Sequence, residues 1–321
     1  MSKKRLGLIT AALAFLILSL LIWAQAAERN TIELLQQSGF TEPLSYKSKK
    51  SFGAVNLTNL KLDADNASTI KSLKAAYSFK NNATLLIDHL DLTGDTLEGK
   101  LSIPGLKPTA SPLTWPSLPI DKIILKNARL ALLTKNWSGL NININAQIFR
   151  NDPSTLQAQT RFTSKQNTLT FGGQATGTIT LDKIILKGDI EHLKINLPHT
   201  KLTRANGSFT LTQRKNQPPE ITLKIKSGGA NILGLPWKNL NGTLTHKENT
   251  TTLNATATAN TDKPIQLTAT EKILTLSAPT QQNLKIFLTD HNREDLTALI
   301  RTTNDRTATL TTAWDTNSTK E

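Results

Sequence analysis

The residues able to do chemistry in this 321-residue chain are few, and their spacing matches no catalytic or metal-binding motif. None of the histidines stands in a His-x-x-x-His or similar ligand spacing, and there is no cysteine to complete a metal site. His192 and His199 lie close in sequence, but a turn predicted between them argues against a shared metal. His291 follows Asp290, yet no Gly-x-Ser-x-Gly or comparable nucleophile accompanies this pair.

Two further groups of residues have the composition of binding sites. Asp88 and Asp91 flank His89, and acidic residues this close together bind Ca²⁺ when a loop carries them. Here the alternation of polar and apolar residues predicts a strand whose polar side chains face water. Gly172-Gly173 and Gly228-Gly229 precede no helix, so neither is typical of a phosphate-binding loop. We therefore expect no catalytic residue, no cofactor site and no metal site, and hence that the protein is not an enzyme.

Alternating strands dominate the sequence, and the clearest is LNININAQIF at residues 140–149. Apolar residues take every second position there, so the strand has one apolar and one polar face. Similar strands are predicted at 51–63, 70–79, 84–103, 221–226, 253–260, 265–270 and 306–314. The fold class is therefore all-β, a long antiparallel sheet with one continuous apolar face. The residues expected to line that face are Leu140, Ile142, Ile144, Ile148, Leu193, Ile195, Leu253, Ile265 and Leu267.

Local signals divide the chain between these strands. Prolines recur through residues 104–119 and predict a loop or an edge crossing, because proline removes a ladder donor. Asn206-Gly207 and Asn241-Gly242 predict hairpin turns. The sequence DKIILK occurs at 121–126 and again at 182–187, which indicates loose repetition. Alanines at every second position of 253–260 predict room for a ligand on the apolar face.

Composition favours an exported β-protein. Only 38% of the residues are hydrophobic and 5% are aromatic, while threonine, a strand-forming residue that tolerates water, is over-represented after residue 150. The net charge of +14 favours an anionic membrane surface or a nucleic acid as partner. The lysines are spread along the strands and no arginines alternate with aromatic residues, so we expect no nucleic-acid binding.

The N-terminus has the pattern of an export signal. Lys3, Lys4 and Arg5 precede an apolar run at 6–23, which is near the lower limit for spanning a bilayer. Ala24-Gln25-Ala26 also offers a cleavage site, so a cleaved signal and a retained anchor are both open. The length of the run and Trp23 at its end favour the retained anchor. We expect an inner-membrane anchor with a periplasmic domain, or a periplasmic protein if the signal is cleaved.

The remaining elements are short. Asn30 is expected to cap a helix over 31–38 that Gly39 ends, and this helix can cover one open end of the sheet. A late helix is expected at 293–301. The expected organisation is an anchor or signal peptide at 1–27, a short helix at 28–40, an elongated β domain at 41–314 with a subdivision near 104–119, and a disordered tail at 315–321.

Several segments resemble a known family. They are LLQQSGF at 34–40, VNLTNLKLD at 55–63, AAYSF at 75–79, LLIDHLDLTG at 85–94 and LPIDKIILKNARLAL at 118–132. Together they resemble the opening portion of the YdbH-type branch of AsmA-like proteins, which are relatives of TamB. The resemblance covers residues 1–150, and the rest of the chain is similar only in style.

This resemblance implies a strongly curved sheet of the β-taco type with an open hydrophobic groove, anchored in the inner membrane of a diderm bacterium. Such proteins are implicated in moving phospholipid between the inner and outer membranes, and their mechanism needs no catalytic residue. The expected partners are phospholipid, the inner membrane through residues 6–23, and an outer-membrane lipoprotein or other envelope proteins. Members of that branch are usually far longer, since about 14 strands span only roughly 65 Å. The chain then corresponds to a reduced member, one segment of a conduit, or a truncated product.

Two other functions are compatible with the sequence. A secreted structural or adhesive β-protein would seal the same apolar residues against a second sheet, and an accessory component of a secretion system would share the grooved fold. An open apolar channel distinguishes the lipid-binding protein from the structural one.

Overall fold

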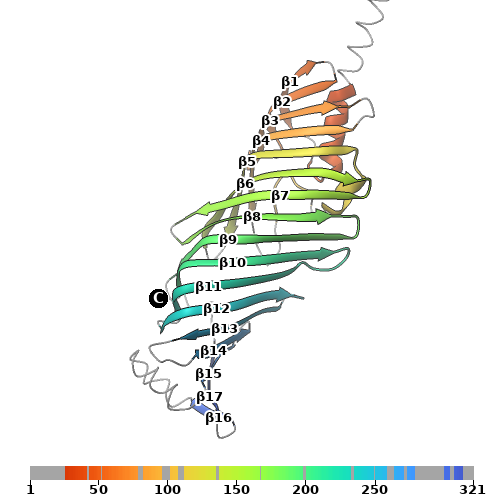
Figure 1. Ribbon diagram of the computed structural model, residues 1–321. Helices are drawn as coiled ribbons and strands as arrows, with labels where there is room; N and C mark the ends of the chain where they lie inside the picture. Colours follow the sequence, from red (N-terminus) through yellow and green to blue (C-terminus); the bar gives the residue numbers. More distant parts are fainter. Residues whose placement is uncertain are drawn as a thin grey trace, which may run out of the picture. The chain divides into compact units, whose positions relative to one another are not determined.

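The computed structural model describes residues 26–41, 43–51, 53–78, 82–95, 102–107, 112–134, 137–166, 168–197, 200–232, 235–248, 250–258, 264–270, 273–278, 300–303 and 307–313. The protein is all-β and mostly antiparallel, as the sequence predicts (Figure 1). The chain forms two compact units. Unit 1 comprises Met1–Phe162 and Thr178–Asp182, and unit 2 comprises Thr163–Gly177 and Lys183–Glu321. Strands β7 (Thr155–Lys165) and β8 (Leu169–Ile179) contribute residues to both units.

Unit 1 contains six strands in chain order, lying side by side (Figure 1). They are β1 (Ser45–Ser51), β2 (Ala54–Lys61), β3 (Ser68–Tyr77), β4 (Ala83–Asp95), β5 (Ile120–Thr134) and β6 (Trp137–Asp152). Only β4 and β5 are parallel among these pairs. Parallel neighbours need a crossing connection, and the Pro-rich stretch 104–119 supplies it with the 3₁₀ helix η2 (Pro112–Ser117). The prediction of a crossing there is confirmed, and the stretch lies inside unit 1.

A helix over residues 26–37 packs on the apolar face of unit 1. Leu34 and Leu35 join a buried cluster with residues of β2 to β5, such as Leu57 and Leu73. The predicted cap at Asn30 is wrong, because residues 26–30 are already helical. The predicted end at Gly39 is confirmed: this glycine has a φ of 104°, a conformation that side chains disfavour.

Buried polar groups fasten this helix to β3. The Thr31 hydroxyl donates to the carbonyl of Ala27 at 2.7 Å and lies 2.8 Å from the Tyr77 hydroxyl, which therefore donates to it. Burial raises the pKa of Tyr77 to about 12, with a smaller contribution from the charge of Glu33. The phenol is thus kept neutral where helix and sheet meet.

Arg150 at the end of β6 binds the crossing of unit 1. Its guanidinium donates to the carbonyls of Pro116 at 3.0 Å, Leu118 at 2.6 Å and Ile120 at 2.9 Å. It also donates to the carbonyl of Pro153 at 2.9 Å. One side chain therefore binds three carbonyls in and directly after η2, in the connection that leads to β5.

Unit 2 is an antiparallel meander. Its strands are β9 (Lys183–Leu197), β10 (Thr200–Arg214), β11 (Glu220–Ile232), β12 (Leu235–Lys247), β13 (Thr250–Thr258), β14 (Pro264–Thr270), β15 (Ile273–Ala278), β16 (Ile300–Thr303) and β17 (Thr307–Ala313). Each pairs with the next up to β15, which pairs with β17, and β17 also pairs with β16.

Two local predictions for unit 2 are wrong, and one falls mainly outside the described residues. Asn206-Gly207 and Asn241-Gly242 lie inside β10 and β12 and not at turns. Glycine serves there for close approach, since a Cβ on Gly207 would lie 2.2 Å from the carbonyl oxygen of Lys224. The helix expected at 293–301 lies outside the described residues up to 299, and Ile300–Thr303 is strand β16. The late strand is confirmed as β17.

Tyr77 predicts a pH dependence of stability. A tyrosine in the unfolded chain has a pKa of about 10, whereas the folded pKa is about 12. The stabilising contribution of the neutral phenol should therefore be complete below pH 10 and decline between roughly pH 10 and 12. Urea unfolding across this range should show a steeper loss for the wild-type chain than for Tyr77→Phe. A parallel loss in both proteins would contradict this account, and Tyr46→Phe is the control.

Arg150 predicts a stability effect specific to its geometry. Hydrogen bonds to a charged donor contribute about 1.5–3 kcal/mol, so Arg150→Ala should lower the free energy of unfolding by about 2 kcal/mol. Arg150→Lys should recover only part of this, because an ammonium lacks the planar fork. Urea unfolding measures both variants, and Arg161→Ala, on an exposed side chain of β7, is the control. Full recovery with lysine would show that charge alone matters.

Candidate functional site

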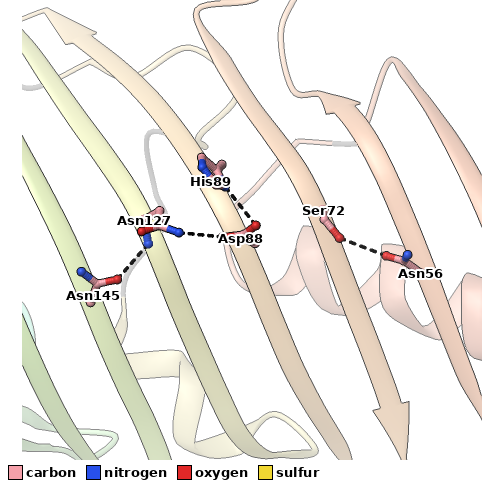
Figure 2. Close-up of polar contacts among 6 residues, drawn as sticks. All are labelled: Asn56, Ser72, Asp88, His89, Asn127 and Asn145. Carbon is pink, nitrogen blue, oxygen red and sulfur yellow. Dashed lines mark hydrogen bonds and ion pairs between the residues drawn. The ribbon is translucent and has the colours of Figure 1, made fainter.

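Asp88 of β4 lies on the polar side of its strand, whereas His246 of β12 is the register partner of Ile221 of β11 and lies on the apolar side. Asp88 and His89 in β4 lie in contact, with 2.9 Å between Oδ2 and Nδ1 (Figure 2). Hydrogen bonds from Asn127 and then from His89 hold the pKa of Asp88 below its usual value. His246 lies 2.9 Å from the Thr251 hydroxyl. Within the described ranges, no three His, Asp or Glu side chains are placed to hold a metal ion. His199 and His291 lie outside those ranges.

His89 belongs to a row of backbone irregularities that crosses unit 1. Asn59 in β2, His89 in β4 and Asn127 in β5 have φ values of 55°, 52° and 52°. The pairing registers of β2–β3, β3–β4, β4–β5 and β5–β6 all skip residues at this level. At this level the register shifts that mark β-bulges occur between β1 and β2 and between β5 and β6, while in the other three pairs the same number of residues is skipped on both strands. We call this row of interruptions the crease.

Unit 2 contains a crease of its own. His192 in β9, Arg204 in β10 and Asn239 in β12 have φ values of 55°, 52° and 51°. Pairing is interrupted at the same level between β9 and β10, and again between β12 and β13. Each strand that carries such a residue is therefore divided into two arms that meet at an angle.

Asparagine side chains stabilise the bulges. The backbone N–H of Asn127 donates to the Asn145 side-chain oxygen at 2.9 Å, and its own amide donates to Asp88 at 3.0 Å (Figure 2). The N–H of His192 donates in the same way to Asn206 at 3.1 Å. A bulge removes the ladder partner of one N–H, and the amide oxygen of the next strand replaces it.

The crease explains an irregular spacing in the sequence. In each affected strand two inward apolar residues stand three positions apart, with a polar residue and then the left-handed residue between them. The six segments are Leu57–Leu60, Ile87–Leu90, Leu125–Ala128, Ile190–Leu193, Leu202–Ala205 and Trp237–Leu240. The extra residue keeps the apolar face on one side through the bend. The positive φ of His89 and His192 is a structural reason for histidine at these two positions, because Asn and His adopt positive φ more readily than most residues.

The apolar face of unit 1 is covered near the helix. Cross-strand pairs continue it from Val55 through Ala75, Leu85 and Ile123 to Ile148. Val55, Ala75 and Leu85 are at most 4% exposed, whereas Ile123 and Ile148 are only half-buried. Exposure therefore rises along the sheet, away from the helix.

The predicted lining residues of β6 lie at this less covered end. Leu140, Ile142, Ile144 and Ile148 are all half-buried and pair with apolar residues of β5. Ile144, opposite Ala128, packs against the buried cluster that contains Leu34. The other three do not belong to that cluster among the described contacts.

The apolar face of unit 2 is built from strands alone. Every described member of its apolar cluster comes from β8 to β14. Leu193, Ile265 and Leu267 are buried members, and Ile195 and Leu253 are partly buried members. The structure therefore brings together these five predicted residues, separately from the four predicted residues of unit 1.

Sequence reasoning missed several members of this cluster. Leu202, Ala230, Trp237 and Leu240 are buried in it, and the bulges that interrupt strict alternation hid them. Ala255 and Ala257, the alanines of β13 beside which the sequence predicts room, are 6% and 1% exposed. The accessible apolar surface lies on the partly buried members, which are Leu169, Phe171, Ile190, Ile195, Ile225 and Leu253.

Comparison with protein-family models, with curated proteins and with solved structures finds no match for this chain. Function must therefore be argued from the residues and from the geometry of the two apolar faces.

The crease yields a prediction that separates a backbone role from a ligand role for His192. A β-branched residue at positive φ costs about 1–2 kcal/mol, whereas glycine adopts it freely. His192→Val should lower the free energy of unfolding by about that amount, and His192→Gly should change it little. Urea unfolding of the two variants measures this difference. Equal losses in both variants would mean that the imidazole, and not the backbone, matters at this position.

Proposed function

We propose that this chain is an envelope protein that binds phospholipid acyl chains in a hydrophobic groove along its apolar sheet faces. In this role it assists lipid transport between the inner and outer membranes. The observation that carries the proposal is the apolar cluster of unit 2, which consists of strand residues alone and keeps six partly buried side chains at its margin. The family resemblance of residues 1–150 points to the same function.

The energetics of lipid transfer suit such a face. Moving one methylene group from an apolar environment into water costs about 0.8 kcal/mol, so an acyl chain needs apolar contact along its whole length. Successive strands offer that contact in steps of about 4.8 Å. The ladder that runs from Ile190 across Ile225 to Leu267 continues over neighbouring strands of unit 2. No catalytic group is needed for such transfer.

The membrane location is part of the proposal. Residues 6–23 are expected to anchor the chain in the inner membrane, with the β units in the periplasm. These residues lie outside the described ranges, in which no helix has both the length and the apolar character needed to cross a bilayer. The proposed partners are phospholipid and, at the far end, an outer-membrane lipoprotein or another envelope protein.

A second candidate function is supported by a specific observation. Ile265 and Leu267 are each only 1% exposed, so part of the apolar face of unit 2 is already closed by packing. A face closed in this way along its whole length would suit a structural or adhesive β-protein. The two functions therefore differ in whether the partly buried side chains touch lipid.

Photocrosslinking of the full chain in a diderm host tests the proposal. A benzophenone amino acid is placed at Ile195 or Leu253, and matched controls carry it at the exposed neighbours Asn196 and Asn254. Neighbouring strand positions point to opposite faces, so only the apolar positions should crosslink to radiolabelled phospholipid. We expect at least a tenfold excess over the controls.

Two outcomes would refute this function. Absence of lipid adducts at both apolar positions in a folded protein would favour the structural or adhesive role. Equal labelling of apolar and polar positions would indicate contact with bulk membrane. With the benzophenone amino acid at Leu253, Ile195→Asp, which places a carboxylate on the same apolar face, should abolish the specific adducts.

A further inference from the structure

Strand β1 has an unusual surface. All seven of its residues are exposed, and its register partners all lie in β2. The described residues include three exposed large hydrophobic side chains, and two of these lie at β1: Leu44, 64% exposed, directly before the strand, and Tyr46, 38% exposed, within it. In unit 1, β1 is the outermost of the strands β1 to β6 (Figure 1).

The same strand carries a cluster of positive charge. Lys47 and Lys49 lie opposite Thr58 and Asn56 of β2, and Asn56 in turn lies opposite Lys74 of β3. These three lysines are exposed. No ion pair within the described part of the chain involves any of them. The polar face of β1 to β3 therefore presents lysine charge that no described carboxylate neutralises.

The other face of β1 is bound to the helix. Lys50 forms an ion pair with Glu28, a residue of helix 26–37. Burial opposes ionisation of Glu28, but hydrogen bonds from Lys50, Ser48 and Tyr46 outweigh it, so the pKa of Glu28 is lowered. This helix follows the apolar run at 6–23 in the sequence. Strand β1 is thereby held beside the part of the chain that leads directly from the expected membrane anchor.

We propose that β1, through Lys47, Lys49 and Lys74 with Leu44 beside the strand, binds the anionic phospholipid head groups of the membrane that holds residues 6–23. The proposal takes from the proposed function only the membrane anchor and does not depend on lipid binding by the apolar faces. It assigns to unit 1 a second membrane contact, made by a strand.

Protection of a sheet edge explains the lysines but not the apolar residues. Lysine on an outer strand prevents pairing with other chains, and the exposed Leu44 works against that effect. At a membrane interface the combination is favourable, because lysine contacts anionic head groups and leucine enters the acyl boundary. Each lysine near an anionic surface contributes about 1 kcal/mol.

The absence of cysteine allows a direct test on the full chain in liposomes. Ser45→Cys carries a fluorophore next to Lys47, and Ser208→Cys, on an exposed residue of β10, is the control site. A quencher attached to lipid head groups reports contact. In phosphatidylglycerol liposomes we expect quenching at residue 45 and not at 208, with much less in phosphatidylcholine and in 0.5 M salt.

Charge variants then test the lysines. Lys47→Gln and Lys49→Gln should each lower the ratio of bound to free label roughly fivefold, which corresponds to about 1 kcal/mol. Lys224→Gln and Lys226→Gln, an exposed pair with the same spacing on β11, should have no effect. Quenching that is equal at 45 and 208, or that ignores lipid charge and Lys47, would overturn the proposal. Neither result affects the photocrosslinking on the apolar faces, so the two proposals fail separately.

Discussion

The structure depends on a backbone constraint: one residue in each of six strands adopts a left-handed conformation inside the sheet. Such a residue has no regular ladder partner, and the strand bends there. Asn145 and Asn206 compensate in the two units by accepting the N–H groups of Asn127 and His192. These interruptions lie at one level across neighbouring strands, so each unit has a continuous row of them.

The bend determines how each unit buries its apolar face without a second sheet. In unit 1 the buried residues beside the crease, such as Leu60 and Ile70, are 0% exposed and are covered with the help of helix 26–37. In unit 2 strands alone supply all described members of the cluster, including Trp237 at 2% exposure. A flat sheet with one apolar face would leave that face to water, at a cost that grows with its area.

Strand positions could be predicted from the sequence because apolar and polar residues alternate along a strand that has one face in the core and one in water. LNININAQIF is strand β6, and the apolar segments near Leu253 and Ile265 are β13 and β14. The crease could not be predicted in this way, since an added residue between Leu202 and Ala205 breaks the period that the argument relies on. The Asn-Gly pairs misled the turn prediction for a related reason. Asn-Gly favours turns, but Gly207 and Gly242 lie within strands, where a neighbouring strand approaches too closely for a side chain. The start of the first helix was predicted at Asn30 because asparagine is a good capping residue. In the structure Asn30 lies inside the helix, which is held to the sheet by the burial of Leu34 and Leu35.

A face that carries lipid has to meet two opposed requirements, and the distribution of burial in unit 2 addresses both. Residues such as Ile265 and Leu267 are closed by tight packing, which holds the bent sheet together. Ile195 and Leu253 belong to the same cluster but retain accessible apolar surface. An entirely closed face would leave acyl chains no surface to contact, and an entirely open face would lack the packing that stabilises the bend. The left-handed residues allow one face to hold both kinds of residue. Each of them keeps the apolar side chains before and after it on the same face of the strand.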